Sequence, residues 1–136
     1  MEIVIKKKEV CELLEKYYRE NKNIEAKVTL SATREPVGLF EEMSCVARVK
    51  VTKKVNILGT LKTVKEELSR DEVLGIFRDL LESQGYLVTG LTYDAYINSN
   101  WVGYGMGETL EHHAYFNGLT LYVKENKLNV NKTLNR

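Results

Sequence analysis

The sequence predicts one α+β domain in which two amphipathic helices cover one face of an antiparallel sheet of four to five strands. Three observations support this class. Two segments repeat apolar residues with helical spacing, and four segments alternate apolar with polar residues as half-buried strands do. The chain also has 136 residues, an ordinary length for a single domain. We expect the domain to span residues 1–124, with a polar, flexible tail over residues 125–136.

The first helix is predicted over residues 7–21, where one apolar stripe consists of Val10, Leu13, Leu14 and Tyr17. A strand is predicted over residues 24–33, because apolar residues alternate there with charged and hydroxyl residues. Residues 34–42 contain Pro36 and Gly38 and are expected to form a connecting loop. A second strand should follow over residues 45–52 and pair antiparallel with the first.

Residues 55–68 are ambiguous, since Gly59 marks a turn or bulge and the segment after it is a candidate third strand. The second helix has clear start signals. Ser69 lies three residues before Glu72, which is the spacing of a capping box, and Leu68 and Val73 take the positions of a hydrophobic staple. The helix should end near Gly85, which favours the left-handed conformation.

Two further strands are predicted, over residues 86–97 and 114–123. The pair Asn117–Gly118 lies between alternating apolar residues and marks either a hairpin turn or a bulge in one long strand. The expected order is therefore α-β-β-(β)-α-β-β. Placing Val10 over Val73 also aligns the apolar residues of both helices and of the strands after them, which suggests an internal α-β-β duplication.

Composition gives no positive signal for several function classes. Lys and Arg total 20 against 19 for Asp and Glu, so overall charge gives no reason to expect a nucleic acid or a membrane as partner. Cys11 and Cys45 fall on apolar faces and are expected to be buried and reduced. The chain begins MEIVIKKKEV, in which apolar residues precede the lysines, and this order is wrong for a signal peptide. We expect a cytoplasmic protein.

Residues 103–118, GYGMGETLEHHAYFNG, stand out from this scaffold. The alternating glycines do not predict a phosphate loop, because the segment after them is too short and too soon interrupted to be the helix that such a loop needs. The two histidines, His112 and His113, are adjacent. Side chains of neighbouring residues diverge on a helix and point to opposite faces on a strand, so a single ion does not easily reach both.

Glu108 and His112 would share a face only if their turn were helical, with Asp94 or Glu111 supplying a further oxygen ligand. A metal-dependent hydrolase using Asp94, Glu108, Glu111, His112 and His113 is therefore one alternative function. Single-stranded nucleic-acid binding through lysines and aromatic residues is another.

The main hypothesis is a non-catalytic binding protein without a cofactor. Residues 98–111 and their flanks combine Tyr, Trp, Gly, Ser and Asn, the composition of adaptable recognition surfaces. The same aromatic residues could instead cover a sheet edge or form a dimer seam. We expect this segment to be an exposed loop that contacts a partner protein or a nucleotide-like ligand through Tyr96, Asn98, Trp101, Tyr104, Met106, Glu108, His112 and His113.

A homodimer is expected too, because a sheet covered on one side leaves a face or an edge open. The size and the composition, rich in Lys, Asn and Glu, suggest an accessory or inhibitor-type protein of a phage or mobile element.

Overall fold

The computed structural model describes residues 1–39, 42–103, 105 and 107–126, and within them the chain is α+β as predicted. The predicted tail lies almost wholly outside these residues. The elements in chain order are β1 (Glu2–Lys6), α1 (Lys7–Lys22), β2 (Glu25–Val37), β3 (Glu42–Ile57), β4 (Thr60–Leu68), α2 (Arg70–Glu82), β5 (Tyr86–Val102) and β6 (Thr109–Glu125).

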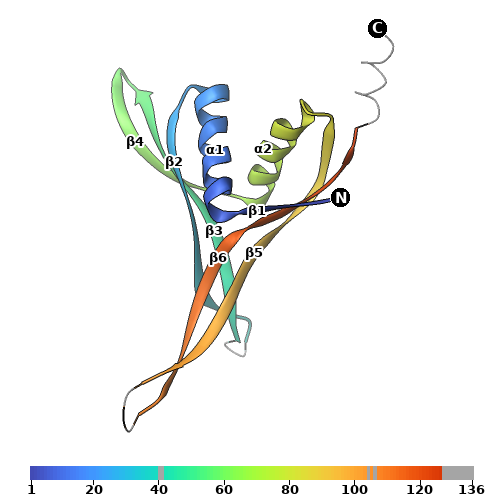
Figure 1. Ribbon diagram of the computed structural model, residues 1–136. Coiled ribbons are helices and arrows are strands. Elements are labelled where there is room, and N and C mark those ends of the chain that lie inside the picture. The colour runs from blue at the N-terminus through green and yellow to red at the C-terminus, as the bar shows by residue number, and fades with distance from the viewer. Residues whose placement is uncertain (40–41, 104, 106, 127–136) are drawn as a thin grey trace.

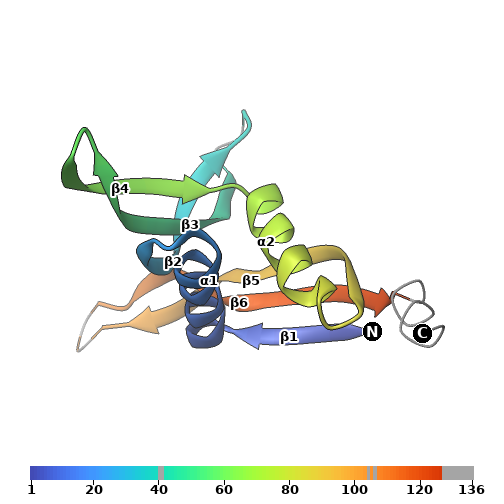
Figure 2. The same ribbon diagram turned by 90° about the horizontal axis from the view of Figure 1, so that it is seen from above.

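The strands form two three-stranded antiparallel sheets, which corrects the prediction of one sheet with four to five strands. One sheet has the order β1-β6-β5 and the other has the order β2-β3-β4. Both helices lie in the space between the two sheets (Figures 1 and 2). Each helix can thus bury its apolar stripe against strands, with α1 packed mainly on β2 and α2 mainly on β5.

β1 is the strand that sequence reasoning missed. It has only five residues and runs directly into α1, so its apolar residues read as the start of the chain rather than as a strand. Its pairing with β6 places Ile5 opposite Leu119, and both side chains are buried. Met1 and Val123 exchange backbone hydrogen bonds, so the N-terminus lies beside the end of β6 (Figure 2).

The chain contains two β-α-β-β repeats that exchange their first strands. The offset between the repeats is 63 residues, the difference between Lys7 and Arg70, which begin the helices of the two repeats. β1 of the first repeat pairs with β6 of the second, and β4 of the second repeat pairs with β3 of the first. Each sheet therefore combines two strands of one repeat with one strand of the other, and the repeat is one strand longer than the α-β-β unit aligned in the sequence.

The capping signals of α2 are confirmed. The Ser69 hydroxyl accepts a hydrogen bond from the backbone N–H of Glu72, whose carboxylate accepts one from the backbone N–H of Ser69. Leu68 and Val73, the predicted staple residues, are both buried. In α1 the equivalent cap position is Lys6, which makes no side-chain cap. The two helix starts therefore differ although their places in the repeats agree.

The long strands reach further than the sequence pattern indicated. Residues 34–37 continue β2 and residue 42 begins β3, so most of the predicted loop over residues 34–42 is strand. The ambiguous segment is the strand β4, joined to β3 by a turn in which Leu58 and Gly59 both have positive φ. Asn117 is the extra residue of a bulge inside β6, which resolves the choice between turn and bulge at Asn117–Gly118.

The core joins both sheets and both helices in one cluster. Its most deeply buried side chains are Phe77, Leu14, Leu91, Leu119, Leu121, Val10, Val49, Val51, Val73 and Val88. Cys11 and Cys45 are free thiols, half-buried rather than fully buried as expected, and burial together with the nearby Glu15 raises the pKa of Cys11. Neither helix in the described part of the chain has the length and apolar character needed to cross a membrane.

Tyr93 gives the fold a testable sensitivity to alkali. Its ring contacts Phe116, its hydroxyl is buried without a hydrogen-bond partner among the described residues, and burial raises its pKa to about 12. An unfolded tyrosine ionises near its ordinary pKa of 10, whereas the folded protein keeps the neutral form to higher pH. The contribution of Tyr93 to stability is therefore complete below pH 10 and is lost as pH rises toward about 12.

We expect Tyr93→Phe to unfold in urea at nearly the wild-type midpoint at pH 8, because the hydroxyl has no partner to lose. Between pH 10 and 12 its stability should fall less steeply than that of the wild type. The remaining fall is expected from Tyr17, Tyr18 and Cys11, whose pKa values are also raised. Identical slopes for the two proteins would show that Tyr93 is not the titrating group.

Candidate functional site

The segment predicted to be an exposed loop is the end of a two-stranded hairpin. β5 continues to Val102 and β6 begins at Thr109, so only residues 103–108 connect the strands. Beyond the helices these strands run on as a ribbon that projects from the body, beside the shorter projection of β2 and β3 (Figure 1). We call residues 96–115 the hairpin extension. Its inner face is the face of the β1-β6-β5 sheet on which Leu91 and Ala95 of β5 contact the core.

The inner face of the hairpin extension changes from core to exposed surface within a few residues. Ala95 packs against the core, and the next inward pairs along the ribbon are Ile97–Ala114, Ser99–His112 and Trp101–Leu110. Trp101 is 68% exposed and Leu110 opposite it is 38% exposed. The ribbon thus ends in an apolar pair that nothing in the described structure covers.

The outer face carries tyrosines and polar side chains. The rings of Tyr96 and Tyr115 lie 5.5 Å apart, and the Asn117 amide donates a 2.9 Å hydrogen bond to the Tyr96 hydroxyl. Asn98 lies opposite His113, whose Nε2 is 3.1 Å from a Glu111 carboxylate oxygen. These contacts run along and across the ribbon and hold its outer side chains in place.

The predicted site residues therefore do not converge. Tyr96, Asn98 and His113 lie on the outer face, whereas Trp101 and His112 lie on the inner face. Glu108 is exposed just before β6, and Tyr104 and Met106 lie outside the described residues.

The histidines point to opposite faces, as expected for neighbours on a strand. Asp94 lies opposite Gly118, several pairs away from His112 and on the other face. Residues 108–112 are not helical, so the arrangement that would bring Glu108 to His112 does not form. Across the described residues, no three His, Cys, Asp or Glu side chains gather as metal ligands would.

Ser99 and His112 form a contact that the sequence did not reveal. Across the strand pair, the Ser99 hydroxyl lies 2.5 Å from His112 Nδ1. A serine nucleophile needs a base that a third group orients, and the described residues show no carboxylate hydrogen-bonded to His112. The pair therefore has part of the geometry of a catalytic dyad without the acid that would orient it.

A cleft lies where the two hairpins separate. Arg34 of β2, Met43 of β3, Ile97 of β5 and His112 of β6 line a space of about 360 Å³. Arg34 Nη1 donates a 2.9 Å hydrogen bond to the backbone carbonyl of His112, which ties the hairpins together. Arg34 Nε is buried and has no hydrogen-bond partner in the described structure. We call this space the hairpin cleft.

The hairpin cleft lies at the junction of the repeats. The 63-residue offset takes Arg34 to Ile97, and the strand pairing makes Met43 equivalent to His112, because Met43 pairs with Pro36 and His112 pairs with Ser99. The four lining residues are thus two pairs of equivalent positions. The volume of the hairpin cleft falls in the ordinary range of ligand pockets, about 300–1,000 Å³.

Arg34 could have been found in the sequence. The alternation that places Val28, Leu30 and Ala32 inward continues for one more period and puts a guanidinium on the apolar face. The predicted loop over residues 34–42 ended the strand before Arg34, so the inward position of its side chain was not predicted. Ile97 and Met43 carried no comparable signal, because an apolar residue on an apolar face reads as core.

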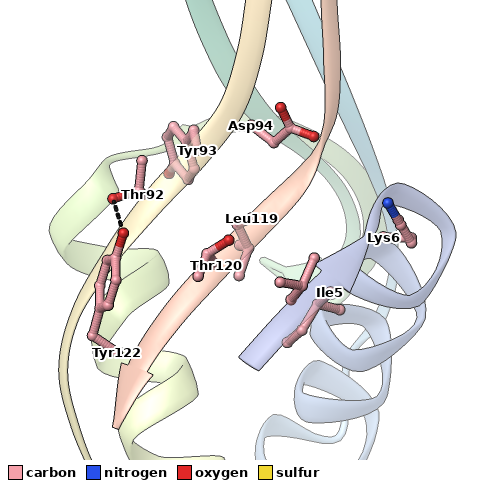
Figure 3. A pocket seen from close by; sticks show the side chains of 9 residues that line it. Ile5, Lys6, Thr92, Tyr93, Asp94, Leu119, Thr120 and Tyr122 are labelled. Carbon is pink, nitrogen blue, oxygen red and sulfur yellow. Dashed lines mark hydrogen bonds between the residues drawn. The ribbon is translucent and has the colours of Figure 1, made fainter. Parts of the chain in front are cut away.

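A second hollow lies on the outer face of the β1-β6-β5 sheet. Gly118 has no side chain and is flanked by Lys6 and Asp94 on the neighbouring strands. Figure 3 shows these two residues with Thr92, whose hydroxyl donates a 3.3 Å hydrogen bond to the Tyr122 hydroxyl. The hollow measures about 210 Å³, smaller than a typical ligand pocket.

A third hollow, of about 490 Å³, lies along the β2-β3-β4 sheet and is bordered by Lys50, Lys65, Glu66 and Glu67. Its two carboxylates already form ion pairs, Glu66 with Lys53 and Glu67 with Arg48. Lys53 also lies over the ring of Tyr18, so it is not part of a free basic surface. The charges of this region offset one another, and the exposed aromatic side chains of the hairpin extension lie on the other sheet.

Comparison of the chain with protein-family models, with curated proteins and with solved structures found no match. The function is therefore inferred from the geometry of the hairpin extension and the hairpin cleft.

Proposed function

We propose that the protein is a non-catalytic binding protein whose hairpin extension contacts a partner protein. The observation that carries this proposal is the exposure of Trp101 and Leu110, which are paired on a ribbon that neither α1 nor α2 covers. A two-stranded ribbon gains little stability from such side chains when water surrounds them. Tryptophan is also among the residues that contribute most to protein interfaces.

The shape of the extension supports a protein partner more than a nucleotide-like ligand. Trp101 and Leu110 lie at the end of a projection, whereas a small ligand is usually enclosed in a pocket. A narrow projection can enter a groove on another protein, which fits an inhibitor-type accessory role. The partner could also be a second copy of this chain, since a homodimer would cover the same side chains.

The two alternative functions have less support. A metal-dependent hydrolase would need Asp94 and His112 on the same face, and the strand register separates them. Single-stranded nucleic-acid binding would need lysines among the aromatic side chains of the hairpin extension. Lys50 and Lys65 lie on the other sheet, and Lys6 lies beside Gly118, outside the hairpin extension.

We expect Trp101→Ala to weaken binding of the partner by about thirtyfold or more, the effect of removing an interface tryptophan. The partner would be captured with the full chain from cells that contain it, and the purified pair measured by calorimetry. The melting temperature of the variant should barely change, because Trp101 is exposed. Leu61→Ala is the matched control, since Leu61 is 65% exposed at the far β3–β4 turn.

Equal affinity of wild type and Trp101→Ala for the partner would contradict the proposal. Sedimentation of the chain alone identifies a second copy as the partner if the dimer is lost in Trp101→Ala. Trp101 is the only tryptophan, so its fluorescence against a panel of nucleotides tests for a nucleotide-like ligand directly. Saturable quenching by one nucleotide would replace the protein partner with that ligand.

A further inference from the structure

We propose that the hairpin cleft binds a side-chain carboxylate of the partner protein, held by Arg34, within an extended segment that also carries an apolar side chain. This inference rests on the proposed function, because it names the chemistry of the same partner. The occupant is an acidic and apolar peptide segment, and Arg34 is the residue that selects it.

The state of Arg34 supplies the electrostatic argument. Its side chain is half-buried, and no carboxylate in residues 1–39, 43–103 or 107–126 forms an ion pair with it. Among the described residues, the one hydrogen-bond partner of its guanidinium is the carbonyl of His112, which accepts from Nη1. A guanidinium carries five N–H donors in a planar fork that matches a carboxylate. A partly buried cation with unused donors is costly, and a carboxylate from the partner would offset that cost.

Arg48 shows what the same side chain does when an acid is available. It lies on the opposite face of the same sheet, and its guanidinium contacts both carboxylate oxygens of Glu35, at 2.7 and 3.0 Å. Glu67 lies near it as well, at 3.7 Å. Arg48 lies opposite Ser31, three residues before Arg34, so the two arginines are near each other in the sheet. Among the side chains that the structure describes, only Arg48 of these two arginines is paired with a carboxylate. We therefore expect the partner protein to supply the carboxylate that pairs with Arg34.

The two sides of the hairpin cleft differ in polarity. Arg34 and His112 come from β2 and β6, which pack against each other, and they form the polar side. Met43 and Ile97 come from β3 and β5 and form the apolar side. A ligand with an anionic group on one side and an apolar group on the other fits this division, whereas a purely apolar or purely ionic ligand fits only half of it.

The position of the cleft favours an extended peptide. Ile97, Ser99 and Trp101 follow one another on the inner face, and four residues of strand span about 13 Å. A partner segment could therefore place its carboxylate at Arg34 and reach Trp101 with a side chain about four residues away. The cleft and the exposed tryptophan would then be parts of one continuous binding surface.

The test uses random dodecamer peptides displayed on phage and selected against the full-length protein. We expect the selected peptides to carry Asp or Glu with an aliphatic or aromatic residue nearby. Arg34→Gln should bind them about tenfold to a hundredfold more weakly, the effect of losing a charge-assisted hydrogen bond. Arg48→Gln is the control, because Arg48 lies on the opposite face and should leave peptide affinity unchanged.

Arg34→Gln also removes the hydrogen bond that joins the two hairpins. A second pair of variants therefore changes Met43 and keeps Arg34. Met43→Glu puts a carboxylate on the strand next to Arg34, two residues from its pairing partner Cys45, and should weaken binding of the acidic peptides. Met43→Gln, of nearly the same size, should not. Selected peptides without acidic enrichment, no selected peptides at all, or equal effects of Met43→Glu and Met43→Gln would each overturn the inference.

The two proposals fail in different ways. If the peptides bind Trp101→Ala more weakly but Arg34→Gln equally well, the hairpin extension is the binding surface and the carboxylate site at Arg34 is wrong. If only Arg34→Gln binds the peptides more weakly, the carboxylate site is retained and the proposed role of Trp101 is wrong.

Discussion

Gly118→Val is expected to lower the free energy of unfolding by about 3–5 kcal/mol, combining backbone strain with a collision in a packed sheet. Gly118 has φ +148°, a conformation that side-chain-bearing residues rarely adopt. A Cβ at this position would also overlap the carbonyl oxygen of Ile5 in β1. Because β1 completes the β1-β6-β5 sheet, the substitution should displace the strand that one repeat lends to the other.

Gly90→Ala is the control for this experiment. Gly90 lies in β5 of the same sheet, and an added Cβ would meet only Tyr122 Cδ2 at 3.9 Å, an ordinary contact. Urea unfolding should therefore leave Gly90→Ala within about 1 kcal/mol of wild type. Hydrogen exchange should show loss of protection in β1 for Gly118→Val alone. If both variants retain wild-type stability, the close approach of β1 to Gly118 is not present in solution.

Phe77→Ala is expected to cost about 3–5 kcal/mol, the usual range for a fully buried phenylalanine. Phe77 is 1% exposed at the centre of a cluster that includes residues of both sheets. The repeats share this core and exchange strands, so the variant should still unfold in one cooperative transition at a lower urea concentration. Near-UV circular dichroism of the tyrosines and far-UV circular dichroism should report the same midpoint.

Leu14→Ala tests the equivalence of the repeats, because Leu14 takes the position of Phe77 in the first repeat and is also fully buried. It should cost about 2–5 kcal/mol and shift the same single transition. Leu61→Ala removes an exposed leucine and should change stability by less than about 0.5 kcal/mol. Two separate transitions in Phe77→Ala would mean that the repeats fold independently, contrary to the shared core.

Local patterns in the sequence predicted the elements well and their assembly poorly. The stripe around Val10, the capping box at Ser69 and the alternation through Val28 each depend on neighbouring residues, and all three appear in the structure. The strand composition of the first sheet depends on β1 pairing with β6, a pairing between residues more than a hundred positions apart. No periodicity near β1 records that pairing.

The candidate site shows the same division. Adjacent histidines on a strand had to point to opposite faces, and this was predictable. The contact between Arg34 and His112 depends on how the two hairpins meet, which no local pattern specifies. Asn117–Gly118 left both a hairpin turn and a bulge open in the sequence, because the two use the same residue types. The close approach of β1 is what requires glycine at position 118.

The pairing of β1 with β6 has a consequence for a fragment that contains only the second repeat. Residues 60–125 contain one complete β-α-β-β repeat, but the strand that pairs with β6 lies in the other repeat. Produced alone, this fragment would have an open edge on β6 and an unused β4. Two such molecules could satisfy each other by swapping, and the resulting symmetric dimer would reproduce the architecture of the intact monomer.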